Sequence, residues 1–593
     1  MVHNDLPSAC LNVPNWGWEA LTFSGGERIF REGDASDSLY VIDCGTVRIE
    51  LEHAELDSES VLALLGVGEY FGEQGILDGG KRSASAIAES DVRLRRLSND
   101  VLERLVSENP AVLADIFRAL GKAVSLKLRA TNEAISRKLS SPTAPYVDGV
   151  VDEAIQAQHV LATLTEDRLD HLLDQVAGAV AREAKALAEL TVEVTRMGSV
   201  TDKERKNQFA SAEIAAGLKG QVGCGVIDPQ AEASGTVIEI GDAAGVVFGL
   251  IPVTNPVATA AFKTLICLKS RNAVILSFPR RATAVGEQFG HLIQQVLRQC
   301  KLPSGVVTCV TDKSSRRMTE TFFKHAGIDL ILATGGRSMV EAAYRSGKPA
   351  YGVGPGNAPV LICEDAKIEN TASAILLSKT FDHGLICGSE HNLIVVASVR
   401  QGLVTALEAG GGAVLKVQEV ERFRQMIVSN DGSSLRRRFI GRSASEIAAA
   451  AKLVRPTPIR LIIVPGTEAE IDNADFVGGE KMAPILSLFT AKNEKAGIEL
   501  AQKLLAREGR GHTAVVHTEN RDRALAFASA MPVSRVLVNS PATQGVIGQT
   551  TGLEPSLVLS CGFYGGNSSC DNIGFRHVRN LKRLAFLEPP TIQ

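Results

Sequence analysis

The segment TFDHGLICGSEHNLIVV, residues 380–396, contains the strongest candidate nucleophile of this chain. Cys387 stands shortly after a glycine and ahead of an apolar run that predicts a strand. A cysteine thiolate in such a place can attack a carbonyl carbon and hold the product as a thioester. The alternative is that Cys387 is an inert buried residue, as we expect for most of the other cysteines.

Three further segments carry groups that such a covalent reaction needs. Residues 333–340, ATGGRSMV, follow the apolar segment IDLIL and open a helix, so Thr334, Gly335 and Gly336 can turn backbone N–H groups toward a dinucleotide. Asn255, in the loop PVTNP, can donate from its side-chain amide to a developing oxyanion. The third segment, GVGPGNAPV, is a glycine-rich loop at 352–360 without a carboxylate.

A second candidate site lies near the N-terminus, in FGEQGILDGGKRSASAIA at residues 71–88. Glu73 and Arg82 flank a glycine-rich turn there. An arginine can pair with the phosphate of a cyclic nucleotide, and a carboxylate can accept a hydrogen bond from its ribose 2′-OH. The alternative is a surface ion pair in a barrel that has lost its ligand.

The elements that must position these residues fall into different classes. From about 21 to 100, short segments alternate apolar and polar residues between turn residues, which predicts an antiparallel β barrel or jelly roll. Helical spacing follows from about 100 to 139. The stretch SSPTAPYVDG, residues 140–149, is rich in Ser and Pro and predicts a linker after a first domain at 1–139.

Beyond the linker, apolar strands alternate with helical patterns, which predicts parallel βαβ units and an α/β fold. We expect a Rossmann-like, cofactor-binding part at 150–370. A second α/β part should follow at 371–593; the family resemblance given below implies that it is the catalytic part and that it ends in a C-terminal oligomerisation arm. With 593 residues, the chain is long enough for several cores, so it should be multidomain.

The composition narrows the function classes. The formal net charge is −4 and no long basic tract is present, so we expect no nucleic-acid partner. No window is apolar enough for a membrane helix, and the N-terminus has no signal-peptide pattern. The ten cysteines are scattered without a CxxC pair or a cluster with histidine, so we expect no metal site and a cytoplasmic protein.

The segments around 15–135 resemble the cyclic-nucleotide-binding family, through GERIFREGDASDSLYVIDCGTVRI and the cassette FGEQGILDGGKRSASAIA. The resemblance implies that Gly72, Glu73, Arg82 and Ser83 contact the sugar-phosphate. It also implies that a helix around 115–135 covers the base. Lys81 stands where many members have proline, but this leaves the charge argument intact. Cyclic AMP is the expected effector, with cyclic GMP left open.

The segments from about 150 to 590 are similar to the CoA-acylating aldehyde dehydrogenases, including the aldehyde half of aldehyde-alcohol dehydrogenases. The motifs PVTNP, KSRNAVI, LATGG, GVGPGN, SKTFD, GHT and GGNS occur in the family's order. The resemblance implies Cys387 as nucleophile and Asn255 as a transition-state donor. It places Thr334, Gly335 and Gly336 in the cofactor loop.

The resemblance also assigns cofactor contacts. Glu480, in GGEKMAP, matches the acid that holds the nicotinamide ribose. Ser277 stands where hydrolytic relatives place a lysine for the adenosine ribose, and Arg280 and Arg281 follow closely. An arginine there could accept a 2′-phosphate, so NAD is expected and NADP stays open. His512, in GHT, lies near the cofactor or CoA path or caps an element.

Hydrolytic family members carry a glutamate in the loop that corresponds to GVGPGN, where it activates water. Without that base, attack by water should be slow, whereas a thiol needs less help. The expected function is therefore oxidation of a short aldehyde to acyl-CoA, with coenzyme A as co-substrate, under control of the cyclic nucleotide. The chain should form a homodimer or homotetramer.

Three alternatives remain at this stage. The C-terminal part could be an inactive scaffold, or a non-acylating or acyl-phosphate-type dehydrogenase that also passes through a thioacyl enzyme. The N-terminal domain could serve oligomerisation or tethering without any response to a nucleotide.

Overall fold

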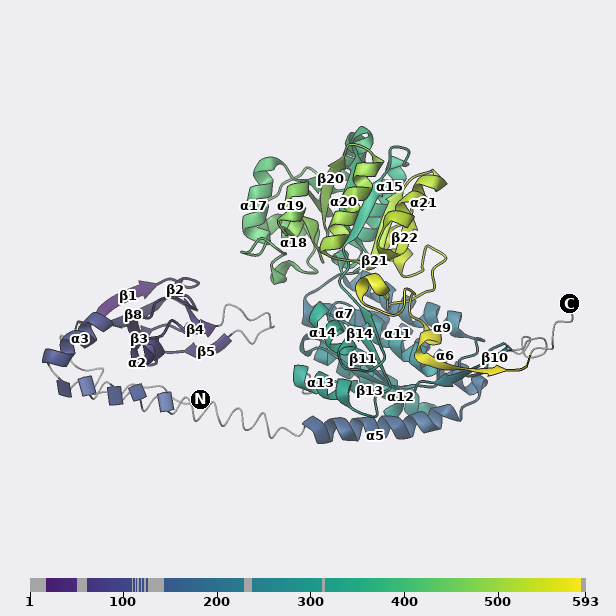
Figure 1. Cartoon of the computed structure of the whole chain (residues 1–593), viewed down its shortest axis with the longest axis horizontal. Helices are drawn as coiled ribbons and strands as arrows, with labels where there is room; N and C mark the ends of the chain where they lie inside the picture. Colours follow the sequence, from purple (N-terminus) through teal and green to yellow (C-terminus); the bar gives the residue numbers. More distant parts are fainter. Residues whose placement is uncertain are drawn as a thin grey trace. The chain divides into compact units, whose positions relative to one another are not determined.

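The computed structural model describes residues 17–50, 61–108, scattered positions between 110 and 125, 143–228, 237–311 and 315–587. The chain divides into two compact units, Met1–Pro142 and Thr143–Gln593. The first is rich in β-strands and the second contains two parallel sheets with helices (Figure 1). The predicted fold class is confirmed.

The first unit is a jelly-roll-like pair of antiparallel sheets. Their strand orders are β1-β8-β3-β6 and β2-β7-β4-β5. Inward residues alternate with outward ones at the start of β8, where Val92 and Leu94 are buried and Arg93 is exposed, whereas Leu97 packs with Val101 and Leu102 of α3 in a separate cluster. The elements are β1 (Glu19–Phe23), β2 (Arg28–Phe30), β3 (Ser38–Cys44), β4 (Val47–Glu50), β5 (Val61–Leu65), β6 (Tyr70–Phe71), α2 (Glu73–Asp78), β7 (Ser85–Ala88), β8 (Val92–Ser98) and α3 (Asn99–Glu108).

The predicted linker at 140–149 is only partly consistent with the structure. Residues 140–142 lie outside the described residues, whereas helix α5 (Thr143–Ala162) includes 143–149. Pro145 does not break this helix because it stands in the first turn, where the backbone N–H has no helical partner in any case. Val147, Val151 and Ala154 then pack α5 against the first parallel sheet of the second unit.

The first parallel sheet has the strand order β13-β12-β11-β14-β15. Its order reverses at β11, so the loops after β11 and β14 lie side by side at the carboxyl edge, where such sheets bind ligands. The elements are β11 (Val246–Leu250), α11 (Pro256–Lys269), β12 (Ala273–Ser277), α12 (Thr283–Gln299), β13 (Val307–Val310), α13 (Arg316–Lys324), β14 (Leu330–Thr334), α14 (Arg337–Tyr344) and β15 (Ala350–Val353).

Helices α6 to α9 precede this sheet and join its core. They are α6 (Glu166–Arg182), α7 (Ala184–Thr195), α8 (Val200–Gln208) and α9 (Ile214–Leu218), with a π-helical turn at Phe209–Glu213 between the last two. Leu172, Val176 and Phe209 pack with Phe262 and Leu265 of α11. A small antiparallel sheet, β23-β10-β9, joins Arg579–Ala585 (β23) to Val237–Ala243 (β10) and Gly225–Val226 (β9).

The second parallel sheet has the order β18-β19-β20-β17-β16-β21-β22. Its strands are β16 (Ala358–Ile362), β17 (Glu390–Val396), β18 (Gly412–Val414), β19 (Leu461–Pro465), β20 (Ile485–Ala491), β21 (Gly511–His517) and β22 (Val533–Val538). Its helices are α15 (Ile368–Thr380), α16 (Arg400–Ala409), α17 (Val417–Ile427), α18 (Ala444–Ala450), α19 (Glu468–Asp472), α20 (Glu494–Arg507), α21 (Arg521–Ala530) and α22 (Ala542–Val546).

The predicted division at 370/371 differs from the structure in one element. Strand β16 already belongs to the second sheet, between β17 and β21. An apolar pentapeptide such as APVLI predicts a buried strand, but its pattern does not say which sheet the strand joins.

Candidate active site

Cys387 and His512 come together at the amino edge of the second parallel sheet. Cys387 lies in the loop before β17, and His512 is the second residue of β21. The imidazole Nε2 lies 3.2 Å from the Cys387 Sγ, and Nδ1 lies 2.9 Å from the hydroxyl of Thr513. When Nδ1 donates to this hydroxyl, Nε2 is free to accept a proton from the thiol.

Burial keeps both members of this pair neutral. It raises the pKa of the Cys387 thiol to about 12, with a further contribution from the nearby Glu480 carboxyl. Burial also lowers the pKa of His512 to about 3, and the positive charge of Arg535 acts in the same direction. The resting pair is therefore a thiol beside a neutral imidazole, an arrangement that suits a nucleophile and its base.

The glycine-rich loop at 352–360 packs directly against the backbone of Cys387. A Cβ atom on Gly356 would lie 1.7 Å from the carbonyl oxygen of Cys387, so only glycine fits. The Gly356 N–H donates to the Glu480 carboxyl at 3.1 Å. Burial and the neighbouring Glu508 raise the pKa of Glu480 to about 8, so this carboxyl group is largely protonated at neutral pH.

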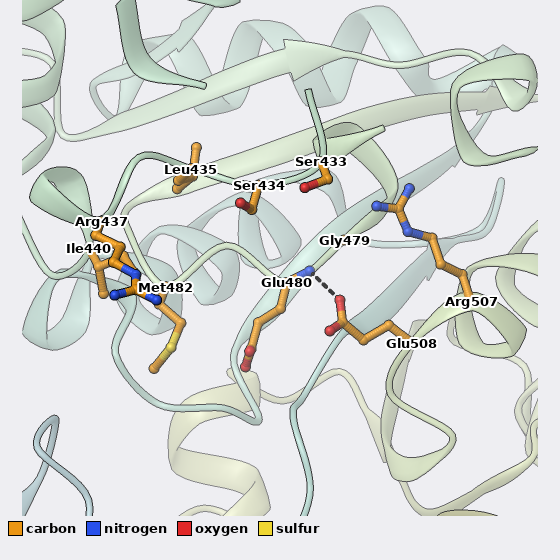
Figure 2. Close-up of a pocket in the computed structure, with 10 residues that line it drawn as sticks. All are labelled: Ser433, Ser434, Leu435, Arg437, Ile440, Gly479, Glu480, Met482, Arg507 and Glu508. Atoms are coloured by element: carbon orange, nitrogen blue, oxygen red, sulfur yellow. Dashed lines mark hydrogen bonds between the residues drawn. The ribbon is translucent and has the colours of Figure 1, made fainter. Parts of the chain in front are cut away.

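Glu480 also lines a cavity of about 420 Å³ (Figure 2). Arg437 and Arg507 lie on opposite sides of this cavity, and the backbone N–H of Glu480 donates to Glu508 at 2.9 Å. The Arg507 guanidinium donates to the backbone carbonyls of Ala474, at 2.9 Å, and Asp475. The predicted ribose-binding acid therefore stands close to Cys387 and beside an open cavity.

Buried polar groups fix the loops around the nucleophile. Asn392 donates to the Asn357 side chain at 2.8 Å, and the Lys481 ammonium donates to Asn392 at 3.1 Å. Lys379 donates to Ser389 at 3.2 Å and to the carbonyl of Lys481 at 2.9 Å. These bonds join the glycine-rich loop, the Cys387 loop and the Glu480 loop into one rigid frame.

The predicted cofactor loops meet at the carboxyl edge of the first sheet. Leu250 pairs with Ala333 and with Ser277, so the loop containing Asn255, the end of β12 and the loop Thr334-Gly335-Gly336 are neighbours. Space beside both glycines is open, and the buried Thr334 hydroxyl has no hydrogen-bond partner among the described residues. These features fit a dinucleotide, which would approach the backbone and meet that hydroxyl.

Arg281 has a contact of its own. Its guanidinium donates to the carbonyl oxygen of Thr195 at 2.6 Å, which ties the turn after β12 to the end of α7. Ser277 is buried at the end of β12. The structure thus brings Ser277 to the cofactor edge, whereas part of the donor capacity of Arg281 is used within the protein.

Asn255 is bound by a lysine that the sequence did not single out. Its Oδ1 accepts a short hydrogen bond from Lys206, and its Nδ2 donates to the Thr254 hydroxyl at 3.2 Å. Lys206 also pairs with Asp382, as does Lys203 at 3.0 Å. Lys203 and Lys206 were not among the predicted site residues, although their spacing at i and i+3 places them on one face of a helix.

The N-terminal site is buried rather than a surface pair. Glu73 and Arg82 are only 4% and 5% exposed. Arg82 donates to the Gly72 carbonyl at 3.1 Å, lies 3.6 Å from Asp37, and stacks 4.1 Å from the centre of the Phe30 ring. Its buried Nε has no hydrogen-bond partner among the described residues, which fits an added phosphate acceptor.

Two further predictions for this site concern Ser83 and the helix expected to cover the base. The Ser83 hydroxyl donates to the Gln74 side chain at 2.6 Å, so it is already used within the protein. Most of the predicted lid around 115–135 lies outside the described residues.

Comparison with known protein families gives two matches along this chain. The model of the aldehyde dehydrogenase family matches residues 122–558. This chain belongs to the aldehyde dehydrogenase family. The cyclic nucleotide-binding domain model matches residues 20–109, ahead of the dehydrogenase. Both resemblances predicted from the sequence are confirmed.

Several relatives of this aldehyde dehydrogenase are acylating enzymes. The chain is 36% identical over 444 residues to the bifunctional aldehyde-alcohol dehydrogenase of Escherichia coli (strain K12), which aligns over 74% of this chain and 49% of that protein. It is 34% identical over 447 residues to the acylating sulfoacetaldehyde dehydrogenase of Cupriavidus necator, covering 74% of this chain and 89% of the relative. The chain thus spans about half the length of the aldehyde-alcohol dehydrogenases that it matches.

A solved structure extends the comparison to the fold. The acetylating aldehyde dehydrogenase of Geobacillus thermoglucosidasius superimposes with a TM-score of 0.72 at 36% identity, covering 76% of this chain and 98% of that one. Within the described part of the chain, no helix of this aldehyde dehydrogenase has the length and apolar character needed to cross a membrane.

One group in the described part of this aldehyde dehydrogenase has ligand-like spacing, namely Cys363, Asp365 and Glu494. The guanidinium of Arg523 already lies 3.1 Å from Asp365 and 3.0 Å from Glu494. A bound cation would face this positive charge, so we assign no metal to the group.

Proposed function

We propose that this aldehyde dehydrogenase is CoA-acylating: it oxidises a short aldehyde to an acyl-CoA through a thioester on Cys387, with NAD as electron acceptor and NADP as an alternative. The Cys387–His512 contact of 3.2 Å, packed against a glycine-rich loop without a carboxylate, carries the proposal. The acylating relatives and the acetylating structure support it.

The first half of the reaction uses His512 and Asn255. His512 accepts the thiol proton at Nε2, and the Cys387 thiolate attacks the carbonyl carbon of the aldehyde. The carbonyl oxygen becomes negatively charged, and the Asn255 amide donates a hydrogen bond to it. The Thr334 loop and Glu480 would hold the nicotinamide cofactor, which would supply the acceptor for the hydride lost from the carbonyl carbon. Cys387 then carries the acyl group.

The second half of the reaction depends on which nucleophile can release the acyl group. The loop at 352–360 contains no carboxylate that could activate water, so hydrolysis of the thioester should be slow. The thiol of coenzyme A needs less activation, because an ordinary thiol is partly ionised near neutral pH. The coenzyme A thiol gives its proton to His512, which has by then released the first proton to solvent. The sulfur attacks the thioester, and the Cys387 thiolate leaves and takes the proton back from His512.

Product analysis tests this proposal. Purified protein with NAD and a short aldehyde should form NADH continuously only when coenzyme A is present. Without coenzyme A, NADH should stop after about one equivalent per active site, because the acyl group stays on Cys387. Continuous formation of free carboxylic acid without coenzyme A would overturn the acylating assignment.

The aldehyde itself is proposed only by class. A short aliphatic aldehyde is our first choice. Two relatives are named for aldehydes with an anionic group, sulfoacetaldehyde in Cupriavidus necator and succinate semialdehyde in Clostridium kluyveri. A panel of acetaldehyde, propanal and succinate semialdehyde therefore tests both chain length and charge, with kcat/KM as the measure.

We also propose that a cyclic nucleotide, cyclic AMP as first choice, binds the N-terminal unit and regulates the dehydrogenase. The buried pair of Glu73 and Arg82 supports binding, and the match over 20–109 supports the class of domain. Regulation requires different affinities for two states of the enzyme, typically a coupling of about 1–3 kcal/mol. If cyclic AMP binds without changing kcat or KM, the domain has another role.

The assembly and the location complete the proposal. The antiparallel pairing of β10 and β23 forms an arm that suits a homodimer or homotetramer, and light scattering would measure the mass. The cysteines in the described residues are all free, which supports a reducing, cytoplasmic setting.

A further inference from the structure

Helix α8 turns two lysines inward, which is unusual for a helix of a soluble protein. Lys203, Lys206 and Asn207 lie on one face and are 3%, 4% and 3% exposed. Lysine side chains normally keep the ammonium group in water. Two buried ammonium groups are costly unless each is paired and hydrogen-bonded, so their partners show what this face does.

Those partners are the two loops that carry the reaction. The Lys203 ammonium donates to the carbonyl of Thr254 at 2.8 Å and to the Asp382 carboxylate at 3.0 Å. Lys206 donates to the same carboxylate and to the side-chain oxygen of Asn255. Lys206 therefore links the Asn255 loop of the first sheet to the turn that precedes Cys387.

Asp382, the shared partner of the two lysines, is itself held in place by its backbone conformation and by further hydrogen bonds. It adopts a left-handed conformation with φ of 45°, as does His383 with 53°, which non-glycine residues rarely do. The Ser199 N–H donates to its carboxylate at 2.9 Å, and its own N–H donates to Asp202 at 3.0 Å. The positive charges of the two lysines lower the pKa of Asp382, so its carboxylate remains ionised despite burial.

The helix is irregular directly after the lysines. The turn Phe209–Glu213 is π-helical and lies between α8 and α9. Such turns are rare and occur often at functional sites, because they shift the register of side chains along a helix. Before the irregularity, Lys203 and Lys206 face the two loops and Asn207 donates to the carbonyl of Ala184 in α7 at 3.0 Å; after it, Phe209 and Ala210 enter the apolar core.

The contact with Lys206 decides which way the Asn255 amide points. An ammonium group only donates, so it selects the amide oxygen as its partner. The Nδ2 group then lies on the other side, where one hydrogen reaches the Thr254 hydroxyl at 3.2 Å. The second hydrogen has no acceptor among the described residues and is available for the carbonyl oxygen of the aldehyde.

We propose that Lys206, held in place by Asp382, is a positioning residue that orients the Asn255 amide for transition-state stabilisation. The proposal rests on the proposed function, since it assigns Asn255 as the donor to the oxyanion. Burial lowers the pKa of Lys206 to about 8 while Asp382 opposes the shift, so the ammonium form predominates at neutral pH. The positive charge of Lys203 also lowers the pKa of Lys206, and the negative charge of Asp202 raises it.

The test is a double-mutant cycle between Lys206→Met and Asn255→Ala, read in the first turnover as the burst of NADH without coenzyme A. K206M should slow this burst by roughly 10–100-fold, a large part of the effect of losing an oxyanion donor. The KM for NAD should change by less than about twofold. In the N255A background, K206M should have almost no further effect, because the amide that it orients is already absent.

Three comparisons make the test decisive. Lys185→Met, at an exposed lysine on α7, is the matched control and should match the wild type. Lys206→Arg keeps a cation beside Asp382 and should show a smaller loss than K206M. If K206M does not fold, the same cycle with K206R should give a smaller loss that also disappears in the N255A background.

Two results would overturn the proposal. One is an unchanged burst rate in K206M. The other is that K206M slows the burst by the same factor in the wild-type and N255A backgrounds, which would indicate that Lys206 has only a structural role. Because the burst precedes the arrival of an acceptor, it does not depend on coenzyme A. A wild type that shows the burst but releases free acid would contradict the acylating function and leave this test intact.

Discussion

The Nε2 atom of His512 lies 3.2 Å from the Sγ of Cys387, although 125 residues separate them. His512 belongs to strand β21, and Cys387 lies in the loop just before β17; these two strands flank β16 in the second sheet. Because parallel strands share the same direction, the segments at their amino ends meet at one edge. The contact gives the thiol proton a direct path to the imidazole, while burial disfavours the charged form of both groups.

Replacing His512 by Gln removes the base while retaining much of its volume. We expect the first-turnover NADH burst to slow by roughly 10²–10⁴-fold, the usual contribution of a general base. Stopped-flow absorbance of NADH measures this rate. His517→Gln is the matched control, because His517 is buried in the same strand but stands at its other end. A burst in H512Q as fast as in the control would exclude His512 as the base.

The ionisation of Cys387 predicts the pH dependence of its alkylation. A raised pKa means less thiolate at a given pH: for a pKa near 12, about one thiol in ten thousand is ionised at pH 8. Iodoacetamide should therefore label Cys387 slowly at pH 7, and the rate should rise about tenfold per pH unit to pH 10.

Peptide mass spectrometry, with the exposed Cys44 as an internal reference, follows this labelling. A rate that levels off below pH 9 would show that Cys387 is ionised at rest.

Gly356 should not tolerate any side chain. The Cβ of an alanine would collide with the Cys387 carbonyl oxygen, so Gly356→Ala must displace either the nucleophile or the glycine-rich loop. We expect at least a tenfold fall in kcat and a lower Tm. Gly217→Ala is the control: Gly217 lies in helix α9 with open space around it, and alanine there should stabilise the helix by about 0.5–1 kcal/mol. Full activity in G356A would mean that the loop moves freely.

Arg82→Ala should weaken cyclic AMP binding. The substitution removes a buried cation, and hydrogen bonds to charged groups contribute about 1.5–3 kcal/mol, which is roughly 10–150-fold in Kd. Isothermal titration with cyclic AMP and cyclic GMP measures both affinity and base preference. Arg93→Ala, at an exposed arginine of β8, should bind as the wild type does.

Activity of the same Arg82 variant separates binding from regulation. In the wild type, cyclic AMP should change kcat or KM, and in R82A this change should disappear at a concentration that saturates the wild type. A response that persists in R82A would mean that the nucleotide acts elsewhere. Unchanged affinity in R82A would instead show that the cassette is not the phosphate site.

Local sequence determined a large part of this protein. The alternation of apolar residues in segments such as DVRLRRLS predicted strands, and the alternation of strands with helices predicted parallel sheets. Cys387, the glycine-rich loops and the cassette with Glu73 and Arg82 were recognisable because their spacing along the chain is short. The family resemblance then placed Glu480 and Asn255.

Tertiary structure decided the relations between distant segments. His512 had two interpretations in the sequence, and only the neighbourhood of β17 and β21 placed it at Cys387. In the sequence alone, Lys206 is indistinguishable from a solvated surface lysine; in the fold, it contacts Asp382 and Asn255. A one-dimensional pattern records which residues share a helix face or strand face, whereas burial of a charge depends on partners far away in the chain. The sequence therefore pointed to Cys387 as the candidate nucleophile, and the fold placed His512 beside it and Lys206 beside Asn255.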